Sequence, residues 1–158
     1  MNTLTIIVTY YNSEEYIQSC LESIKQQRTQ DFELIIVNDG STDQSEQLMH
    51  ETLKDYDKKV NFINLKNNQG HAHARNVALG EVETPYFMFL DADDELASYA
   101  ITFYLEKFNY TDGLIAPIHS FTTKRPQIVD LDRVTVEFRN ANTNVNEFLR
   151  KQSAVSYT

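Results

Sequence analysis

The stretch that decides the fold is Pro85 to Leu96, PYFMFLDADDEL, in which an apolar run ends in a cluster of aspartates. Residues 85–90 show no alternation of polar and apolar side chains, which is typical of a strand buried on both faces of a parallel sheet. Asp91, Asp93 and Asp94 follow at once, and carboxylates this close repel one another. The stretch therefore predicts an α/β sheet with an acidic edge that favours a bound cation.

Outward from this stretch, strand-like and helix-like segments alternate over the first 118 residues. Strands are expected at 4–9, 32–37, 60–65, 85–90 and 114–118, with helices after Asn12 and at 44–56, 71–79 and 99–108. Alternation at this spacing predicts βαβ units and right-handed crossovers. The fold class is α/β, with a mostly parallel sheet flanked by helices.

Asn12 is expected to cap the first helix, with Glu15 completing an asparagine version of the capping box. The apolar face of that helix is predicted to comprise Tyr16, Ile17, Cys20, Leu21 and Ile24.

Composition limits the class of protein. The chain has 158 residues, 41% of them hydrophobic, which suits one globular domain. Its 14 Lys and Arg against 23 Asp and Glu give a net charge of −9 without a clustered basic face, so nucleic acid is not an expected partner. Cys20 is the only cysteine, which favours a reducing, cytoplasmic location. We expect neither a signal peptide nor a membrane-spanning segment in this chain.

Polar clusters follow three of the expected strands: Tyr10 to Asn12, Asn38 to Asp43, and Asp91 to Asp94. Ligands of open α/β sheets bind outside the carboxyl ends of the strands, where the strand order reverses. We therefore expect the three clusters to meet at one edge of the sheet.

Two of these clusters allow two interpretations each. The acids at 91–94 either ligate Mg²⁺ or Mn²⁺ together with a diphosphate, or cap a helix that begins near Leu96. Asp39 either belongs to a simple turn before the next helix, or accepts a hydrogen bond from the edge of a base that stacks on Tyr11.

Other motifs are excluded or left open. The four glycines, Gly40, Gly70, Gly80 and Gly113, cannot form a dinucleotide-binding fingerprint or a P-loop. His71 and His73 do not share a helical face, which argues against a metal site there. Arg75 either steadies the acidic cluster, contacts a nucleotide, or is a solvated surface charge.

Four segments, taken in order, resemble glycosyltransferase family 2, an inverting family with the GT-A fold. They are IIVTYYNSEEYIQSCLESIKQQ (6–27), FELIIVNDGSTDQS (32–45), NNQGHAHARNVAL (67–79) and PYFMFLDADDEL (85–96). The resemblance implies a nucleotide-diphosphate-sugar donor, most often UDP-linked, and Mn²⁺ or Mg²⁺.

The resemblance also assigns roles to residues. Tyr11 would stack on the base, Asp39 would bind its edge, and Arg75 would support the donor site. Asp93 would ligate the metal, with Asp91 near the ribose and the metal. The full donor-site set is Thr9, Tyr11, Asn12, Asp39, Arg75, Asp91, Ala92 and Asp93.

Three departures from the family pattern stand out. Thr9 replaces a frequent proline, and Asn38 replaces the first aspartate of a VDDGSTD motif. No residue between Ser120 and Thr158 matches the family's catalytic base, which single-displacement inversion requires. We expect a donor-binding GT-A core at 1–120, an incomplete acceptor-side region at 121–158, and a general base beyond Thr158.

The leading hypothesis is thus the donor half of an inverting transferase that builds surface polysaccharide, teichoic acid or a glycoconjugate. Its acceptor would be a glycan, a polyol phosphate or a lipid-linked molecule. Regions of the polypeptide that this sequence lacks would hold the protein at the inner face of the membrane. The alternative is a degenerate, non-catalytic nucleotide-binding or interaction module of a larger protein. A third interpretation, a haloacid-dehalogenase-type phosphatase, is disfavoured because Glu95 occupies a Thr or Val position and the DxD follows the fourth strand.

Overall fold

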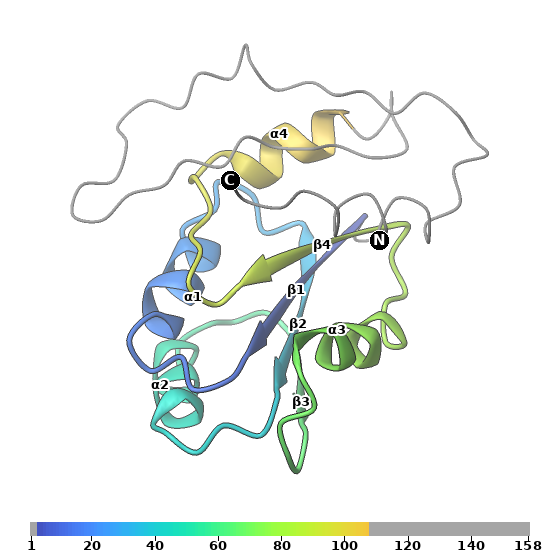
Figure 1. Cartoon of the computed structure of the whole chain (residues 1–158). Coiled ribbons are helices and arrows are strands. Elements are labelled where there is room, and N and C mark those ends of the chain that lie inside the picture. Colours follow the sequence, from blue (N-terminus) through green and yellow to red (C-terminus); the bar gives the residue numbers. More distant parts are fainter. Residues whose placement is uncertain (1–2, 108–158) are drawn as a thin grey trace, which may run out of the picture. The chain divides into compact units, whose positions relative to one another are not determined.

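The computed structural model describes residues 3–107, which form alternating strands and helices (Figure 1). Of these, residues 3–105 belong to one compact unit. In chain order the elements are β1 (Leu4–Tyr10), α1 (Ile17–Lys25), β2 (Phe32–Asn38), α2 (Ser45–Thr52), β3 (Val60–Asn64), α3 (His71–Leu79), β4 (Tyr86–Asp91) and α4 (Ala100–Lys107).

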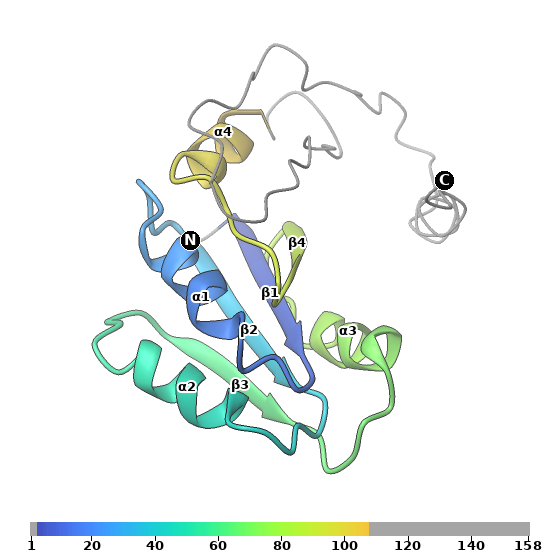
Figure 2. The ribbon, with the colours of Figure 1, turned by 60° about the vertical axis from the view of Figure 1, so that its left-hand side comes forward.

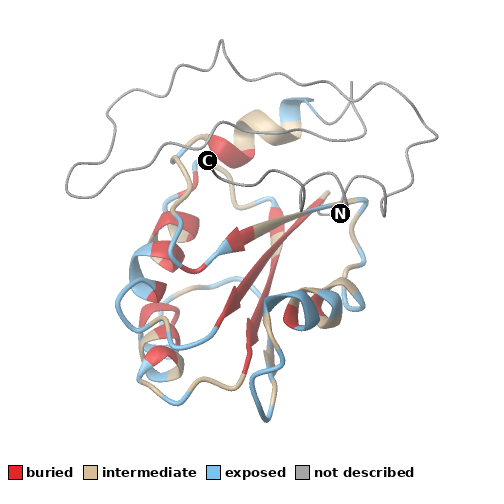
Figure 3. Ribbon diagram, viewed as in Figure 1, coloured by how far each residue is buried: buried red, intermediate tan, exposed pale blue. Residues whose placement is uncertain are grey.

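The four strands form one parallel sheet in the order β3-β2-β1-β4. β1 is buried along its whole length, as its apolar β-branched run predicts (Figure 3). The chain adds β2 and β3 on one side of β1 and then returns to place β4 on the other side. The strand order therefore reverses between β1 and β4, where open α/β sheets bind ligands.

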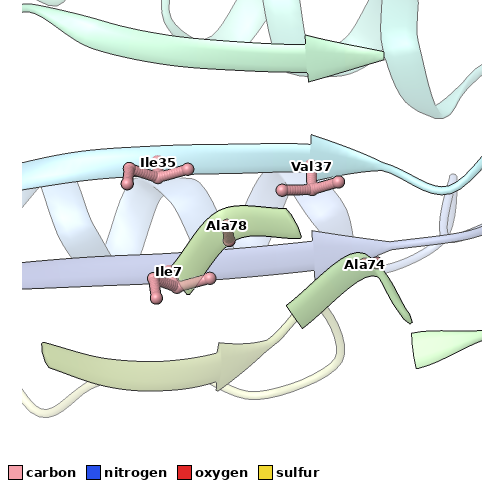
Figure 4. Packing of buried hydrophobic residues seen from close by; sticks show 5 residues of the cluster. All are labelled: Ile7, Ile35, Val37, Ala74 and Ala78. Carbon is pink, nitrogen blue, oxygen red and sulfur yellow. The ribbon is translucent and has the colours of Figure 1, made fainter. Parts of the chain in front are cut away.

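Helices cover both faces of the sheet. Figure 2 shows α1 and α2 on one face and α3 on the other. Beneath α3, the buried side chains of Ile7, Ile35 and Val37 pack against Ala74 and Ala78 (Figure 4). The two alanines let the helix backbone approach the sheet closely.

The predicted α/β class and the parallel sheet are confirmed, but three local expectations are wrong. α1 begins at Ile17, and no side chain of a capping residue closes its first turn. Tyr16 is 51% exposed and does not join the core face of the helix. In β4 only Leu90 is buried and Phe87 is 36% exposed, so this strand is not covered on both faces within the described residues.

The strand expected at 114–118 and the domain boundary placed at 120 lie outside the described residues. Within residues 3–107, no helix has the length and apolar character needed to cross a bilayer.

Replacing Ala74 by leucine tests the close packing of α3. Ala74 is fully buried, so the added side chain overpacks the helix–sheet contact, and we expect a loss of about 1–3 kcal/mol in the free energy of unfolding. Ala72→Leu is the matched control, since Ala72 is exposed on the same helix and should change stability by less than about 0.5 kcal/mol. Urea denaturation measures both, and equal stability of the two variants would contradict the packing.

Candidate nucleotide-sugar site

The carboxyl ends of β1, β2 and β4 meet at one edge of the sheet, as expected. Thr9 pairs in register with Val37 of β2 on one side and with Asp91 of β4 on the other. Tyr10 pairs with Asn38, the last residue of β2. The three polar clusters that follow these strands therefore leave the sheet side by side.

Asp91, the first acid of the DxD motif, is held by Arg75. The Arg75 guanidinium donates a hydrogen bond from Nη2 to Oδ1 of Asp91 and lies 5.0 Å from the centre of the Phe89 ring. The Asp91 side chain nevertheless remains 52% exposed. Of the three interpretations of Arg75, this contact matches the one in which it steadies the acidic cluster.

The acids at 91–94 do not cap a helix. The Asp94 N–H donates to the Asp91 carbonyl oxygen at 3.0 Å and forms a turn, whereas α4 begins only at Ala100. Ala92 is buried within this turn, and Asp93 and Asp94, which follow it, are exposed.

Charge accumulates at this turn. Partial burial, followed by repulsion from Asp93 and Asp91, raises the pKa of Asp94 above its usual range. Cys20 lies beneath and donates from Sγ to the Asp91 carbonyl oxygen at 3.6 Å. Burial, together with the nearby acids, raises the pKa of the Cys20 thiol to about 12, so it stays protonated at neutral pH.

The donor atoms at this turn suit a hard cation. Within residues 3–107, no three His, Cys, Asp or Glu side chains are grouped so that they could enclose a metal by themselves. Mg²⁺ needs only one or two carboxylates, because phosphate oxygens and water complete its shell. Asp93 is exposed, and Asp91 uses Oδ1 for Arg75, so Asp93 and the second oxygen of Asp91 fit that requirement.

Asp39 lies one residue beyond the end of β2, and its side chain is buried, with 3% exposure. Its Oδ1 accepts the Gln69 N–H at 2.9 Å and its Oδ2 accepts the Gly70 N–H at 2.8 Å. These two contacts join the loop after β2 to the loop before α3. Tyr11, 45% exposed, follows the end of β1 and offers an aromatic face at the same edge.

Asn12 does not cap α1; it ties the loop after β1 to the loop after β2. Its backbone is in the left-handed region, with φ of 48°, which asparagine tolerates better than most residues. Its Oδ1 accepts the Thr42 N–H at 2.8 Å, and its own N–H donates to Ser41 Oγ at 3.0 Å.

A second, reciprocal pair of contacts joins the same loops, and it was not foreseen from the sequence. The Glu14 N–H donates to Asp43 Oδ2 at 3.1 Å, and the Gln44 N–H donates to Glu14 Oε2 at 3.0 Å. Burial opposes ionisation of Asp43, but hydrogen bonds from Ser45 and Glu14 outweigh it and lower the pKa. In the sequence, the polar run directly after Asp39-Gly40 is the feature that indicates such contacts.

Gly40 permits the loops to come this close. Its φ is +72°, and a Cβ there would lie 2.7 Å from the backbone carbonyl carbon of Asn67. The loop after β2 therefore contacts the backbone of the loop before α3 directly. Asp39 accepts hydrogen bonds from the same loop.

Comparison with known proteins agrees with this geometry. A family model described as "Glycosyl transferase family 2" matches residues 5–154, so the chain belongs to glycosyltransferase family 2.

Among individual relatives, the chain is 81% identical over 154 residues to the teichoic acid poly(glycerol phosphate) polymerase of Staphylococcus epidermidis. That match covers 98% of this chain but 21% of the relative, so the chain spans about a fifth of that protein's length. It is also 34% identical over 100 residues to the poly(ribitol-phosphate) beta-glucosyltransferase of Bacillus spizizenii, covering 62% of this chain and 16% of the relative.

Solved structures share the fold. The S. aureus TarS fragment 1–349 in complex with UDP superposes with a TM-score of 0.62 at 31% identity, over 68% of this chain and 32% of that one. The same fragment has been solved with UDP-GlcNAc. The mannosyltransferase PcManGT from Pyrobaculum calidifontis, solved with GDP-Man and Mn²⁺, superposes with a TM-score of 0.57 at 26% identity, over 60% of this chain and 29% of that one.

Alanine substitution at Gly40 and Gly70, the glycines with positive φ within residues 3–107, tests the close approach of the loops. Gly70 has φ of 89° and ψ of 152°, a backbone region that is essentially restricted to glycine, and a Cβ there would meet open space, so Gly70→Ala should cost only this backbone strain, about 1–3 kcal/mol. Gly40→Ala adds a backbone clash and should cost about 1–3 kcal/mol more. Chemical denaturation compares the two, and equal losses would show that the approach at Asn67 is not tight.

Proposed function

We propose that this chain is the donor-binding part of an inverting glycosyltransferase and binds a UDP-sugar together with Mn²⁺ or Mg²⁺. The observation that carries the proposal is that Tyr11, Asp39 and the Asp91–Asp93 turn follow strands that end at one edge of the sheet. The solved relatives that hold UDP, UDP-GlcNAc or GDP-Man with Mn²⁺ support the same class of ligand.

Each residue group has a separate task in this proposal. Tyr11 stacks on the base, and the carboxylate of Asp39 accepts an N–H of the base edge through lone pairs that its two backbone contacts leave free. Asp93 holds the cation, with Asp91 beside it. Thr9 at the end of β1, Asn12 in the loop after β1 and Ala92 in the turn after β4 complete the donor site. When bound, the cation would stabilise negative charge on the departing diphosphate.

The acceptor is proposed from the relatives' names alone. Two of them are named for poly(glycerol phosphate) and poly(ribitol-phosphate), so we propose a polyol-phosphate polymer as the acceptor class and teichoic acid synthesis as the process. The general base is assigned to a part of the polypeptide beyond Thr158. A nucleotide-sugar donor and an unpaired cysteine suit a cytoplasmic location. We propose that other regions of the protein hold it at the inner face of the membrane.

One observation favours a second candidate. The relative with 81% identity is named for polymerising glycerol phosphate and is about five times as long as the matched segment. The chain could therefore be a module that binds nucleotide or polymer without transferring sugar. Incubating the full-length protein with a panel of labelled nucleotide sugars and a polyol-phosphate acceptor separates the two, because only the transferase labels the polymer.

Calorimetric titration of UDP into this chain tests donor binding. With Mn²⁺ present we expect saturable heat. Asp93→Ala should remove the dependence on Mn²⁺, since Asp93 is the principal cation ligand. Tyr11→Ala should weaken binding by about fivefold or more through lost stacking, which contributes about 1–3 kcal/mol per base.

Asp57→Ala is the matched control, because the Asp57 side chain is 82% exposed and lies outside the loops of the site. It should bind UDP as the unsubstituted chain does. Absence of heat with the unsubstituted chain, or an unchanged Mn²⁺ dependence in Asp93→Ala, would overturn the proposal.

A further inference from the structure

The start of α3 is anchored by a buried carboxylate from another strand. Asp39 accepts the N–H groups of Gln69 and Gly70, and Gly70 is the N-cap residue of α3. N–H groups at a helix start carry partial positive charge and stabilise a nearby carboxylate. Two charged hydrogen bonds of this kind, made by a side chain that is 3% exposed, fix where the helix begins.

The same helix holds the first acid of the DxD turn. Arg75, one turn into α3, donates to Asp91 and stacks over Phe89 of β4. Its Nε atom is buried and has no hydrogen-bond partner among the described residues, so the Phe89 contact and the Asp91 bond set its position. Ala74, directly before Arg75, and Ala78, one turn after Ala74, pack against Ile7, Ile35 and Val37 of the sheet, so the helix is held on the sheet on both sides of Arg75.

We infer that α3 mechanically links the two ends of the site, and that Asp39 is a positioning residue for Asp91. The Asp39 carboxylate fixes the start of the helix, and the helix carries the Arg75 guanidinium to Asp91. Asp39 thereby influences the geometry of the cation-binding turn without contacting it.

The inference rests on the proposed function in one respect. A base that hydrogen-bonds to Asp39 uses the same carboxylate that holds the start of α3. Binding of the base therefore changes the position of the Arg75 and Asp91 side chains. Coupling of this kind is reciprocal: occupation of the cation turn must change the affinity for the base by the same factor.

The first test uses the nucleotide-free chain and the isosteric variant Asp39→Asn, in which one carboxylate oxygen becomes an NH₂ group. If the NH₂ group faces Gln69, the Gln69 N–H loses its acceptor, and we expect its hydrogen exchange to quicken about tenfold. If the NH₂ group faces Gly70, the Gly70 N–H keeps Asn68 Oδ1, to which it also donates at 2.9 Å, and its exchange should quicken by less. The Arg75 Nε–H resonance should shift and exchange faster. Asp31→Asn is the matched control, because Asp31 is exposed and directly precedes β2. It should leave both signals unchanged.

The second test approaches from the other end and does not depend on whether Asp39→Asn folds. Arg75→Met keeps an unbranched stem but removes the bond to Asp91, and it should quicken exchange at Gln69 and Gly70 although Asp39 is intact. Arg75→Lys should restore part of the protection, because it keeps the charge. Asn76→Ala, exposed on the same helix, should have no effect.

An unchanged Arg75 Nε–H signal in Asp39→Asn, or unchanged Gln69 and Gly70 exchange in Arg75→Met, would overturn the link. Both measurements are made without nucleotide or metal. A failure of UDP to bind would instead overturn the proposed function and leave these results standing.

Discussion

The concentration of carboxylates at one edge of a parallel sheet is the constraint on which the rest of the site depends. Each acid is stabilised differently: Asp39 by backbone N–H groups at the start of α3, Asp43 by Ser45 and Glu14, and Asp91 by Arg75. Asp93 and Asp94 remain at the exposed turn, where partial burial and then repulsion from Asp93 and Asp91 raise the pKa of Asp94. An edge of this kind favours a cation, and a cation in turn lets a diphosphate approach an acidic protein.

The loops around this edge are tied to one another rather than to their own helices. Asn12 reaches the loop after β2, Glu14 and Asp43 exchange contacts between the same loops, and Gly40 rests on the backbone at Asn67. Such cross-connections hold the rim in one arrangement before any ligand binds, and so reduce the ordering cost of binding. Tyr11, at 45% exposure, is the aromatic side chain that this arrangement leaves open to a base.

Strand positions and the meeting of the polar clusters could be predicted from the sequence, because apolar β-branched runs and strand-end polar residues are local signals. Helix α3 was predicted with its observed bounds, His71–Leu79. The start of α1 was not, because Asn12 has a tertiary partner in Thr42 that competes with the capping role. The contacts of Asp39 with residues 69 and 70, and of Arg75 with Asp91, join segments distant in sequence, so no local pattern could specify them.

The central claim is that one edge of this sheet binds a nucleotide diphosphate through a cation on the DxD turn. Anomalous diffraction at the manganese edge, from crystals of this chain grown with UDP and Mn²⁺, tests it most directly. The account predicts an anomalous peak within ligand distance of Asp93. The diphosphate should bind this ion on the side opposite Asp93, and the uracil should contact Tyr11 and Asp39. A peak away from Asp93, or a uracil bound elsewhere on the chain, would contradict it.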